Sequence, residues 1–201
     1  LEAYIFNMRD RTSESGEYGA FISPADREKF HAELTKVEDW LYDHEDATKV
    51  MYIDKLDELK KFGEPVVYRS KESQLRGESI SALSATISKY TVAAESPGDK
   101  YGHISPDKLN MIIQECKTMS KWLSDLQDKQ AGLQKYEKPV LVSADMEKKD
   151  QELTKLAEDI LKEPKPKAPE PPKEEEKKEE APKEETPVEE PPKEAGVLDV
   201  D

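Results

Sequence analysis

Apolar residues recur at helical spacing along most of the chain, and the clearest stretch follows residue 23. Ser23 and Pro24 are typical of a helix N-terminus, because a serine hydroxyl caps free amides and proline loses no hydrogen bond at the first helical position. The next apolar residues lie three or four positions apart and therefore share one helix face: Phe30, Leu34, Val37 and Leu41. We predict a helix from Pro24 to the acidic residues 43–46, with Trp40 at the edge of its apolar face.

A second helix is predicted after this acidic break. Its apolar side holds Tyr52, Leu56 and Leu59, and the glycine and proline at Gly63 and Pro65 are typical of a helix end. The two helices would form a hairpin. The residues expected to anchor its core are Phe30, Leu34, Val37, Trp40, Leu41, Leu56 and Leu59.

The rest of the first 162 residues also shows helical periodicity. Apolar residues follow helical spacing over residues 1–8 and again over 66–94, and the proline and glycines of residues 95–103 predict a loop. A fragment that begins within a helix would explain the periodicity from the first residue on. Two short apolar runs, VVY and VLV, are too isolated to build a sheet.

Two more helices are predicted after this loop. One begins at Ser105 and Pro106 and carries a broad apolar face, with Trp122 and Leu123 as its core anchors. The last is capped by Ser143 and ends before proline 164. The sequence therefore predicts an all-α fold, an antiparallel helix bundle over residues 1–162.

Composition separates the last segment from this bundle. The chain is 38% charged with a net charge of −14, and residues 163–201 hold 9 of its 14 prolines and −7 of that charge. Such a segment buries too little apolar surface to offset the conformational entropy lost on ordering. We predict that 163–201 is a disordered acidic tail rich in Pro, Glu and Lys.

No arrangement of residues points to catalysis. The three histidines have no metal-ligand spacing, Cys116 is the only cysteine and lies on an apolar helix face, and no glycine-rich phosphate loop is present. No basic patch suited to nucleic acid occurs, and no apolar stretch is long enough to cross a membrane. We expect no enzyme activity, no cofactor and no metal, and no nucleic-acid or membrane partner. Ser96 and Thr186 precede proline and are candidate phosphorylation sites.

One polar stripe lies beside the apolar face of the first long helix. His31, Thr35, Glu38 and Tyr42 recur at spacings of four, three and four. A rigid helix that presents an aromatic and an acidic side chain is suited to a protein contact. A plain solvated flank is the other interpretation, and periodicity alone leaves both open.

Several stretches resemble the 110-kDa heat-shock protein family, in particular its plant-type cytosolic members. The similarity is to the C-terminal helical region and tail of that family, and it is carried by four segments: LEAYIFNMRDR at 1–11, VEDWLYDHEDATKVMYIDKLDELKKFGEPVVYR at 37–69, ECKTMSKWLSDLQDKQ at 115–130, and KPVLVSADM at 138–146 with the KPKAPEPPKEEE tail after it. The WLYD and YxxKLDEL pair is the specific part, whereas an acidic tail is not specific.

The resemblance implies a fragment of a stress-response chaperone in the cytoplasm, or in the cytoplasm and nucleus. Its lid-like helical region would clasp a 70-kDa chaperone and support release of ADP, and the parent protein would hold unfolded clients soluble. ATP binding would belong to a domain upstream of this fragment. On this resemblance, the stripe that contains Thr35 and Glu38 faces the partner.

Two further expectations remain. The chain ends in LDVD, where Leu198 replaces an acid of the EEVD terminus that binds tetratricopeptide-repeat adaptors, so we do not expect such adaptors as partners. An alternative to the chaperone function is an autonomous helical scaffold or adaptor with a flexible acidic spacer.

Overall fold

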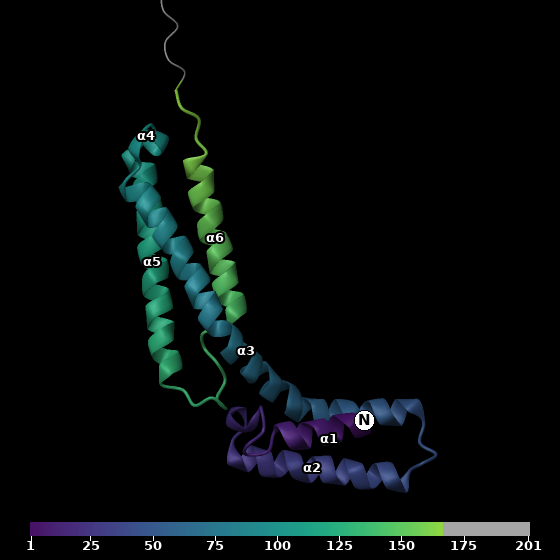
Figure 1. Cartoon of the computed structure of the whole chain (residues 1–201). Helices are drawn as coiled ribbons and strands as arrows, with labels where there is room; N and C mark the ends of the chain where they lie inside the picture. Colours follow the sequence, from purple (N-terminus) through teal and green to yellow (C-terminus); the bar gives the residue numbers. More distant parts are fainter. Residues whose placement is uncertain (167–201) are drawn as a thin grey trace, which may run out of the picture. The chain divides into compact units, whose positions relative to one another are not determined.

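The described part of the chain is entirely helical. A computed structural model describes residues 1–166, and within that range it contains helices and no strand. The elements in chain order are α1 (Glu2–Arg11), a short 3-10 helix η1 (Gly19–Phe21), α2 (Pro24–Asp43), α3 (Lys49–Glu95), α4 (Gly98–Tyr101), α5 (Pro106–Ala131) and α6 (Ser143–Leu161) (Figure 1). The predicted all-α class is confirmed. The compact unit ends at Pro166, and most of the predicted tail, residues 167–201 with Thr186 and the LDVD terminus, lies outside the described residues.

Helix α2 begins where the local sequence places it. The Ser23 hydroxyl accepts a hydrogen bond from the Asp26 amide at 3.1 Å and donates to the Asp26 carboxylate at 2.7 Å. Pro24 occupies the first helical position. The cap and the proline together fix the point at which the chain enters the helix.

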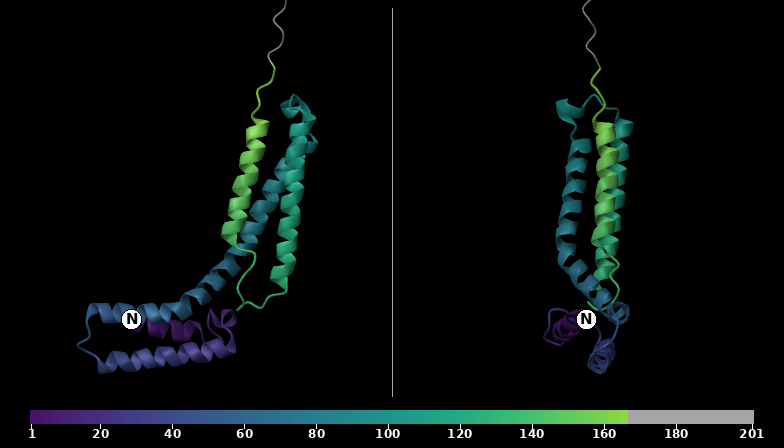
Figure 2. Two further views of the ribbon diagram at one scale, coloured as in Figure 1. Left: turned by 180° about the vertical axis from the view of Figure 1, so that it is seen from behind. Right: turned by 90° about the vertical axis from the view of Figure 1, so that its right-hand side faces the viewer.

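The predicted helix end at Gly63 and Pro65 is wrong. Both residues lie inside α3, which is 47 residues long. Proline inside a helix lacks the amide proton for one hydrogen bond and crowds the preceding turn, which commonly bends the helix. Figures 1 and 2 show that α3 changes direction along its length. Gly63 is buried, and a Cβ atom there would lie 2.1 Å from the Tyr4 hydroxyl. The glycine therefore permits close packing of α1 on α3 and does not end the helix.

Two hydrophobic clusters share α3. The first joins α1, η1 and α2 to the N-terminal part of α3, with buried Ile5, Phe30 and Leu59 among its members. The second joins the C-terminal part of α3 to α5 and α6, with buried Leu83 and Leu153 among its members. In both views of Figure 2, α5 and α6 lie alongside this second part of α3. α3 is the one helix of the described chain that contributes to both clusters.

The structure divides the expected core anchors into two groups. Phe30, Leu34, Val37, Leu59 and Leu123 are buried. Trp40, Leu41, Leu56 and Trp122 are only half-buried.

The α5–α6 connection is held by side chains of α3. Val142, rather than the predicted Ser143, is the N-cap of α6, and Ser143 is its first helical residue. The carboxylate of Glu72, which is 6% exposed, accepts hydrogen bonds from the Ser143 amide at 2.7 Å and from the Ser143 hydroxyl at 2.8 Å. The cap of α6 is thus supplied from another helix.

The predicted loop 95–103 contains the four-residue helix α4, and Ser96 is an exposed C-cap of α3.

None of the helices within residues 1–166 is long and apolar enough to span a bilayer.

Candidate partner-binding surface

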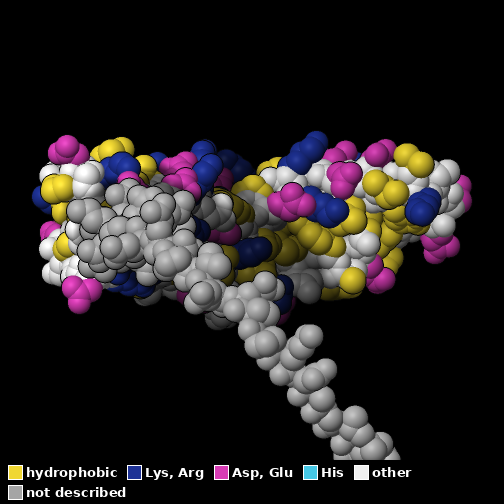
Figure 3. All heavy atoms as spheres, turned by 90° about the horizontal axis from the view of Figure 1, so that it is seen from above, with side chains coloured by type: hydrophobic (Ala, Val, Ile, Leu, Met, Phe, Trp, Pro, Cys, Tyr) yellow, Lys and Arg dark blue, Asp and Glu magenta, His cyan; other side chains and the backbone are white. Residues whose placement is uncertain are grey.

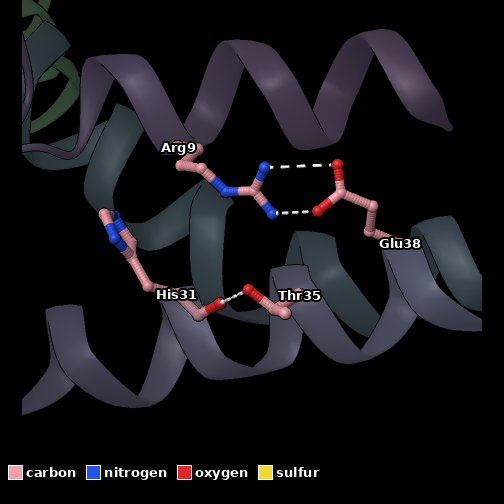
Figure 4. Close-up of polar contacts among 4 residues, drawn as sticks. All are labelled: Arg9, His31, Thr35 and Glu38. Carbon is pink, nitrogen blue, oxygen red and sulfur yellow. Dashed lines mark hydrogen bonds and ion pairs between the residues drawn. The ribbon is translucent and has the colours of Figure 1, made fainter.

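The polar stripe of α2 does not form one free surface. Figure 4 shows Glu38 paired with Arg9 of α1. His31 contacts the residue that follows α1, whereas Thr35 and Tyr42 are exposed. Only Thr35 and Tyr42 of the stripe are thus exposed to solvent, and whether they contact a partner stays a prediction.

Glu38 is paired with Arg9 of α1. The two guanidinium nitrogens donate to the two carboxylate oxygens at 3.3 and 2.5 Å, in the parallel geometry that Figure 4 shows. The Arg9 and Glu38 side chains are 32% and 18% exposed. This hydrogen bond lowers the pKa of the Glu38 carboxyl below its ordinary value. Glu38 therefore ties α2 to α1, which limits its availability to a partner.

His31 is hydrogen-bonded to a fully buried threonine. The Thr12 hydroxyl donates to the Met8 carbonyl at 2.5 Å, so the Nε2–H of His31, 2.9 Å away, acts as the donor to that hydroxyl. Burial, together with the charges of Arg27 and Arg9, lowers the pKa of His31. The lowered pKa favours the neutral form of the imidazole.

Arg27 strengthens the same junction. Its Nε donates to the Thr12 carbonyl at 2.9 Å, and its Nη2 donates to the Gly19 carbonyl at 2.7 Å. The segment between α1 and α2 thus has its backbone held by a side chain of α2. Arg9, Thr12 and Arg27 were not among the residues predicted for this site, because the pairings depend on how α1 and α2 meet in space.

Thr35 and Tyr42 are the members of the stripe that remain accessible. The Thr35 hydroxyl donates to the His31 carbonyl of its own helix at 3.1 Å, and no other element covers it. Tyr42 is 63% exposed. These two side chains lie two helical turns apart on the exposed side of α2.

An aromatic cluster closes the tip of the α2–α3 hairpin. The Trp40 ring stacks on His44 with centroids 5.1 Å apart and meets the edge of Tyr52 at 5.6 Å. The Tyr52 hydroxyl donates to the His44 carbonyl at 3.3 Å. Trp40 therefore joins two helices at the rim of the core.

The single cysteine of the chain is engaged in packing. Cys116 is buried in the second cluster, and burial raises the pKa of its thiol, which opposes formation of a nucleophilic thiolate. Within residues 1–166, no three His, Cys, Asp or Glu side chains gather in a way that could hold a metal ion.

The amino-acid sequence is similar to heat-shock proteins from plants and animals. It is 42% identical to heat shock 70 kDa protein 15 of Arabidopsis thaliana over 167 residues, 37% identical to human heat shock 70 kDa protein 4 over 174 residues, and 34% identical to heat shock protein 110 of Caenorhabditis elegans over 170 residues. Each match covers 83% of this chain. The chain is homologous to a segment of the large heat-shock proteins.

This heat-shock segment spans about a fifth of its relatives, because the matches cover 20 to 22% of their lengths. The resemblance to the 110-kDa family is confirmed by these identities. No family model and no solved structure matches the chain.

Proposed function

We propose that this chain is the helical arm of a cytoplasmic chaperone that promotes release of ADP from 70-kDa heat-shock chaperones and holds unfolded polypeptides in solution. The observation that carries the proposal is the similarity to heat-shock proteins over 83% of the chain, at identities of 34 to 42%. ATP would bind to a part of the parent protein outside this segment.

The fold suits an arm that supports a partner. A single helix, α3, contributes to both hydrophobic clusters, so the surface of α2 is attached to a continuous element. The exposed residues Thr35 and Tyr42 are the proposed contacts to the partner. Glu38 and His31 would act indirectly, by holding α2 against α1.

Release of a fluorescent ADP from a 70-kDa chaperone tests the proposal. The assay uses the longer protein of which this chain is proposed to be a part, with Thr35→Ala and Tyr42→Ala combined. We expect slower release and weaker binding by calorimetry, with an unchanged melting temperature, because surface substitutions usually change stability by less than about 0.5 kcal/mol.

The control variant replaces the same two residue types, an exposed threonine and an exposed tyrosine, outside α2. Thr118 is also an exposed helix threonine that donates to a carbonyl of its own helix, and Tyr136 is an exposed tyrosine. Thr118→Ala with Tyr136→Ala should leave release unchanged. Equal release by both double variants would reject Thr35 and Tyr42 as contacts.

Whether this chain alone accelerates ADP release is tested separately. We expect this chain alone not to accelerate release, because a single arm does not enclose a partner. Light scattering from a heat-unfolded client measures the holding activity of the longer protein. If that protein neither accelerates release nor reduces scattering, the chaperone proposal fails and the scaffold function is favoured.

A further inference from the structure

Three adjoining grooves lie beside the middle of α3. The largest, of about 500 Å³, lies between α3 and the α5–α6 connection and includes Lys61, Arg69 and Lys138 in its walls. The next, of about 140 Å³, shares Arg69 with the first and adds Arg76 and Lys135. A third, of about 390 Å³, shares Lys135 and continues past η1. We refer to these three together as the basic groove.

Five of the seven Lys and Arg side chains that line the basic groove have no carboxylate partner within the described fold. The other two, Lys60 and Arg27, pair with Asp57 and Glu14, and the carboxylates of Glu64 and Glu137 also lie in the groove walls. Across residues 1–166, none of these five side chains has a carboxylate oxygen within 4.0 Å: Lys61, Arg69, Arg76, Lys135 and Lys138. The same 166 residues contain 25 Lys and Arg against 32 Asp and Glu, a net charge of −7. A concentration of unpaired cations on an acidic molecule marks this groove as attractive to negative charge.

Hydrogen bonds to main-chain carbonyls fix the two arginines. The Nε of Arg69 donates to the Phe21 carbonyl at 2.8 Å, and the Nε of Arg76 donates to the Leu141 carbonyl at 3.1 Å. Both guanidinium groups are therefore positioned before a ligand arrives, which reduces the entropy lost on binding. Burial lowers the pKa of Arg69, and a carboxylate brought near it would compensate for this desolvation.

The backbone wall opposite α3 is also held in place. The Gln130 side-chain oxygen accepts hydrogen bonds from the Val140 amide at 2.9 Å and from the Leu141 amide at 3.2 Å. The segment that carries Lys138 and Pro139 is thus tied to the end of α5. The groove is largely preformed, as binding sites for small segments commonly are.

Apolar surface accompanies these charges. Pro65, Tyr68 and Pro139 line the largest groove; Pro65 is exposed and Tyr68 is 46% exposed, whereas Pro139 is buried. On the face that Figure 3 shows, hydrophobic side chains lie next to Lys and Arg side chains. A ligand that fits this surface carries both carboxylates and apolar groups.

We propose that the basic groove binds an extended acidic peptide segment of a partner protein, in which apolar side chains alternate with Asp and Glu. The carboxylates would pair with the five cations, and the apolar side chains would pack on Tyr68 and Pro65. A nucleic acid is disfavoured because its long run of phosphates would meet the acidic remainder of the surface. The binding does not depend on the exchange activity proposed above.

Fluorescence anisotropy with a labelled peptide of repeated Glu-Leu-Asp-Phe units tests this site on the full chain. Lys61→Glu combined with Lys138→Glu should weaken binding roughly tenfold at low salt, because two exposed ion pairs with the peptide are lost and replaced by repulsion. Added salt should reduce the affinity of the unmodified chain. Helicity by circular dichroism should be unchanged, since both lysines are exposed.

The control variant has the same change in charge outside the groove. Lys117 and Lys155 are exposed, and neither has a carboxylate within 4.0 Å among the described residues, so Lys117→Glu with Lys155→Glu should leave the affinity nearly unchanged. A peptide with Lys in place of the acids should not bind, and one with Ala in place of Leu and Phe should bind more weakly.

Three results would overturn the proposal. The first is no binding of the Glu-Leu-Asp-Phe peptide, and the second is equal loss in both charge-reversed variants. The third is binding of a labelled RNA oligonucleotide that depends on Lys61 and Lys138 while the peptide does not, which would assign the groove to nucleic acid.

Discussion

Whether Gly63→Ala stabilises or destabilises the protein should depend on one oxygen atom, the hydroxyl of Tyr4. A Cβ atom at Gly63 would lie 2.1 Å from the Tyr4 hydroxyl, 3.0 Å from the Met8 Cε and 3.3 Å from the Tyr4 Cζ. The Tyr4 hydroxyl is itself buried without a hydrogen-bond partner in the described structure. Burial, with a smaller contribution from Glu64, raises the pKa of Tyr4 to about 12.

Two opposing effects set the magnitude for Gly63→Ala. Alanine is favoured over glycine inside a helix by roughly 0.5–1 kcal/mol. Displacing the Tyr4 ring to relieve the overlap costs about 1–3 kcal/mol, as overpacking usually does. We expect a net loss of about 1 kcal/mol in the free energy of unfolding.

Removal of the Tyr4 hydroxyl should make Gly63→Ala stabilising. Tyr4→Phe alone should stabilise the protein by about 1 kcal/mol, because a buried hydroxyl without a partner is eliminated. In that background the closest Tyr4 atom to the new methyl is a ring carbon, at 3.3 Å. The helix propensity then outweighs the contact, and Gly63→Ala should stabilise by about 0.5 kcal/mol.

Urea denaturation of the four proteins, followed by circular dichroism, gives the coupling energy between the two positions. We expect a coupling above about 1 kcal/mol. Additive effects of the two substitutions, or a stabilising Gly63→Ala in the unmodified chain, would refute the argument that Gly63 exists to admit Tyr4.

Three further predictions concern stability. Glu72→Ala leaves the Ser143 amide without its acceptor and should lower the melting temperature, through a loss of about 1–2 kcal/mol measured by calorimetry. Glu38→Gln should reduce the pH dependence of the free energy of unfolding. The pKa of Glu38 is lower in the folded than in the unfolded protein, so the Glu38 carboxylate stabilises the fold above the unfolded pKa of about 4.3. This stabilisation is lost as the pH falls towards the folded-state pKa. Urea titrations between neutral and acidic pH would then show a smaller acid-side loss for the variant than for the unmodified chain. Trp40→Ala should cost about 1–2 kcal/mol in urea denaturation, less than the 3–5 kcal/mol typical of a fully buried aromatic, because Trp40 is half-buried.

Local sequence rules located the starts of α2 and α5. Ser23 with Pro24 and Ser105 with Pro106 stand at these starts, and a proline at the first helical position acts within a single turn. The Ser23 side chain also caps α2, whereas the Ser105 side chain makes no capping hydrogen bond. Apolar spacing likewise indicated which side of α2 is buried, since Phe30 and its periodic neighbours lie in the first cluster.

Contacts between distant residues could not be predicted in this way. Arg9 and Glu38 are separated by 29 positions, and Glu72 and Ser143 by 71. Periodicity does not encode such pairs, because they depend on how separate helices meet. Gly63 shows the same limit, since a glycine that admits a neighbouring ring has the same local signature as a helix end.

The sharing of α3 between both clusters has a consequence for how the protein opens. Unfolding of either cluster leaves half of α3 without its packing partners, and an isolated helix of that length is only marginally stable in water. A partial opening must therefore break α3 at some point, and Pro65 is the least costly one because its missing amide already removes one helical hydrogen bond. Native-state hydrogen exchange should then divide α3 near this residue, with amides on either side exchanging together with their own cluster.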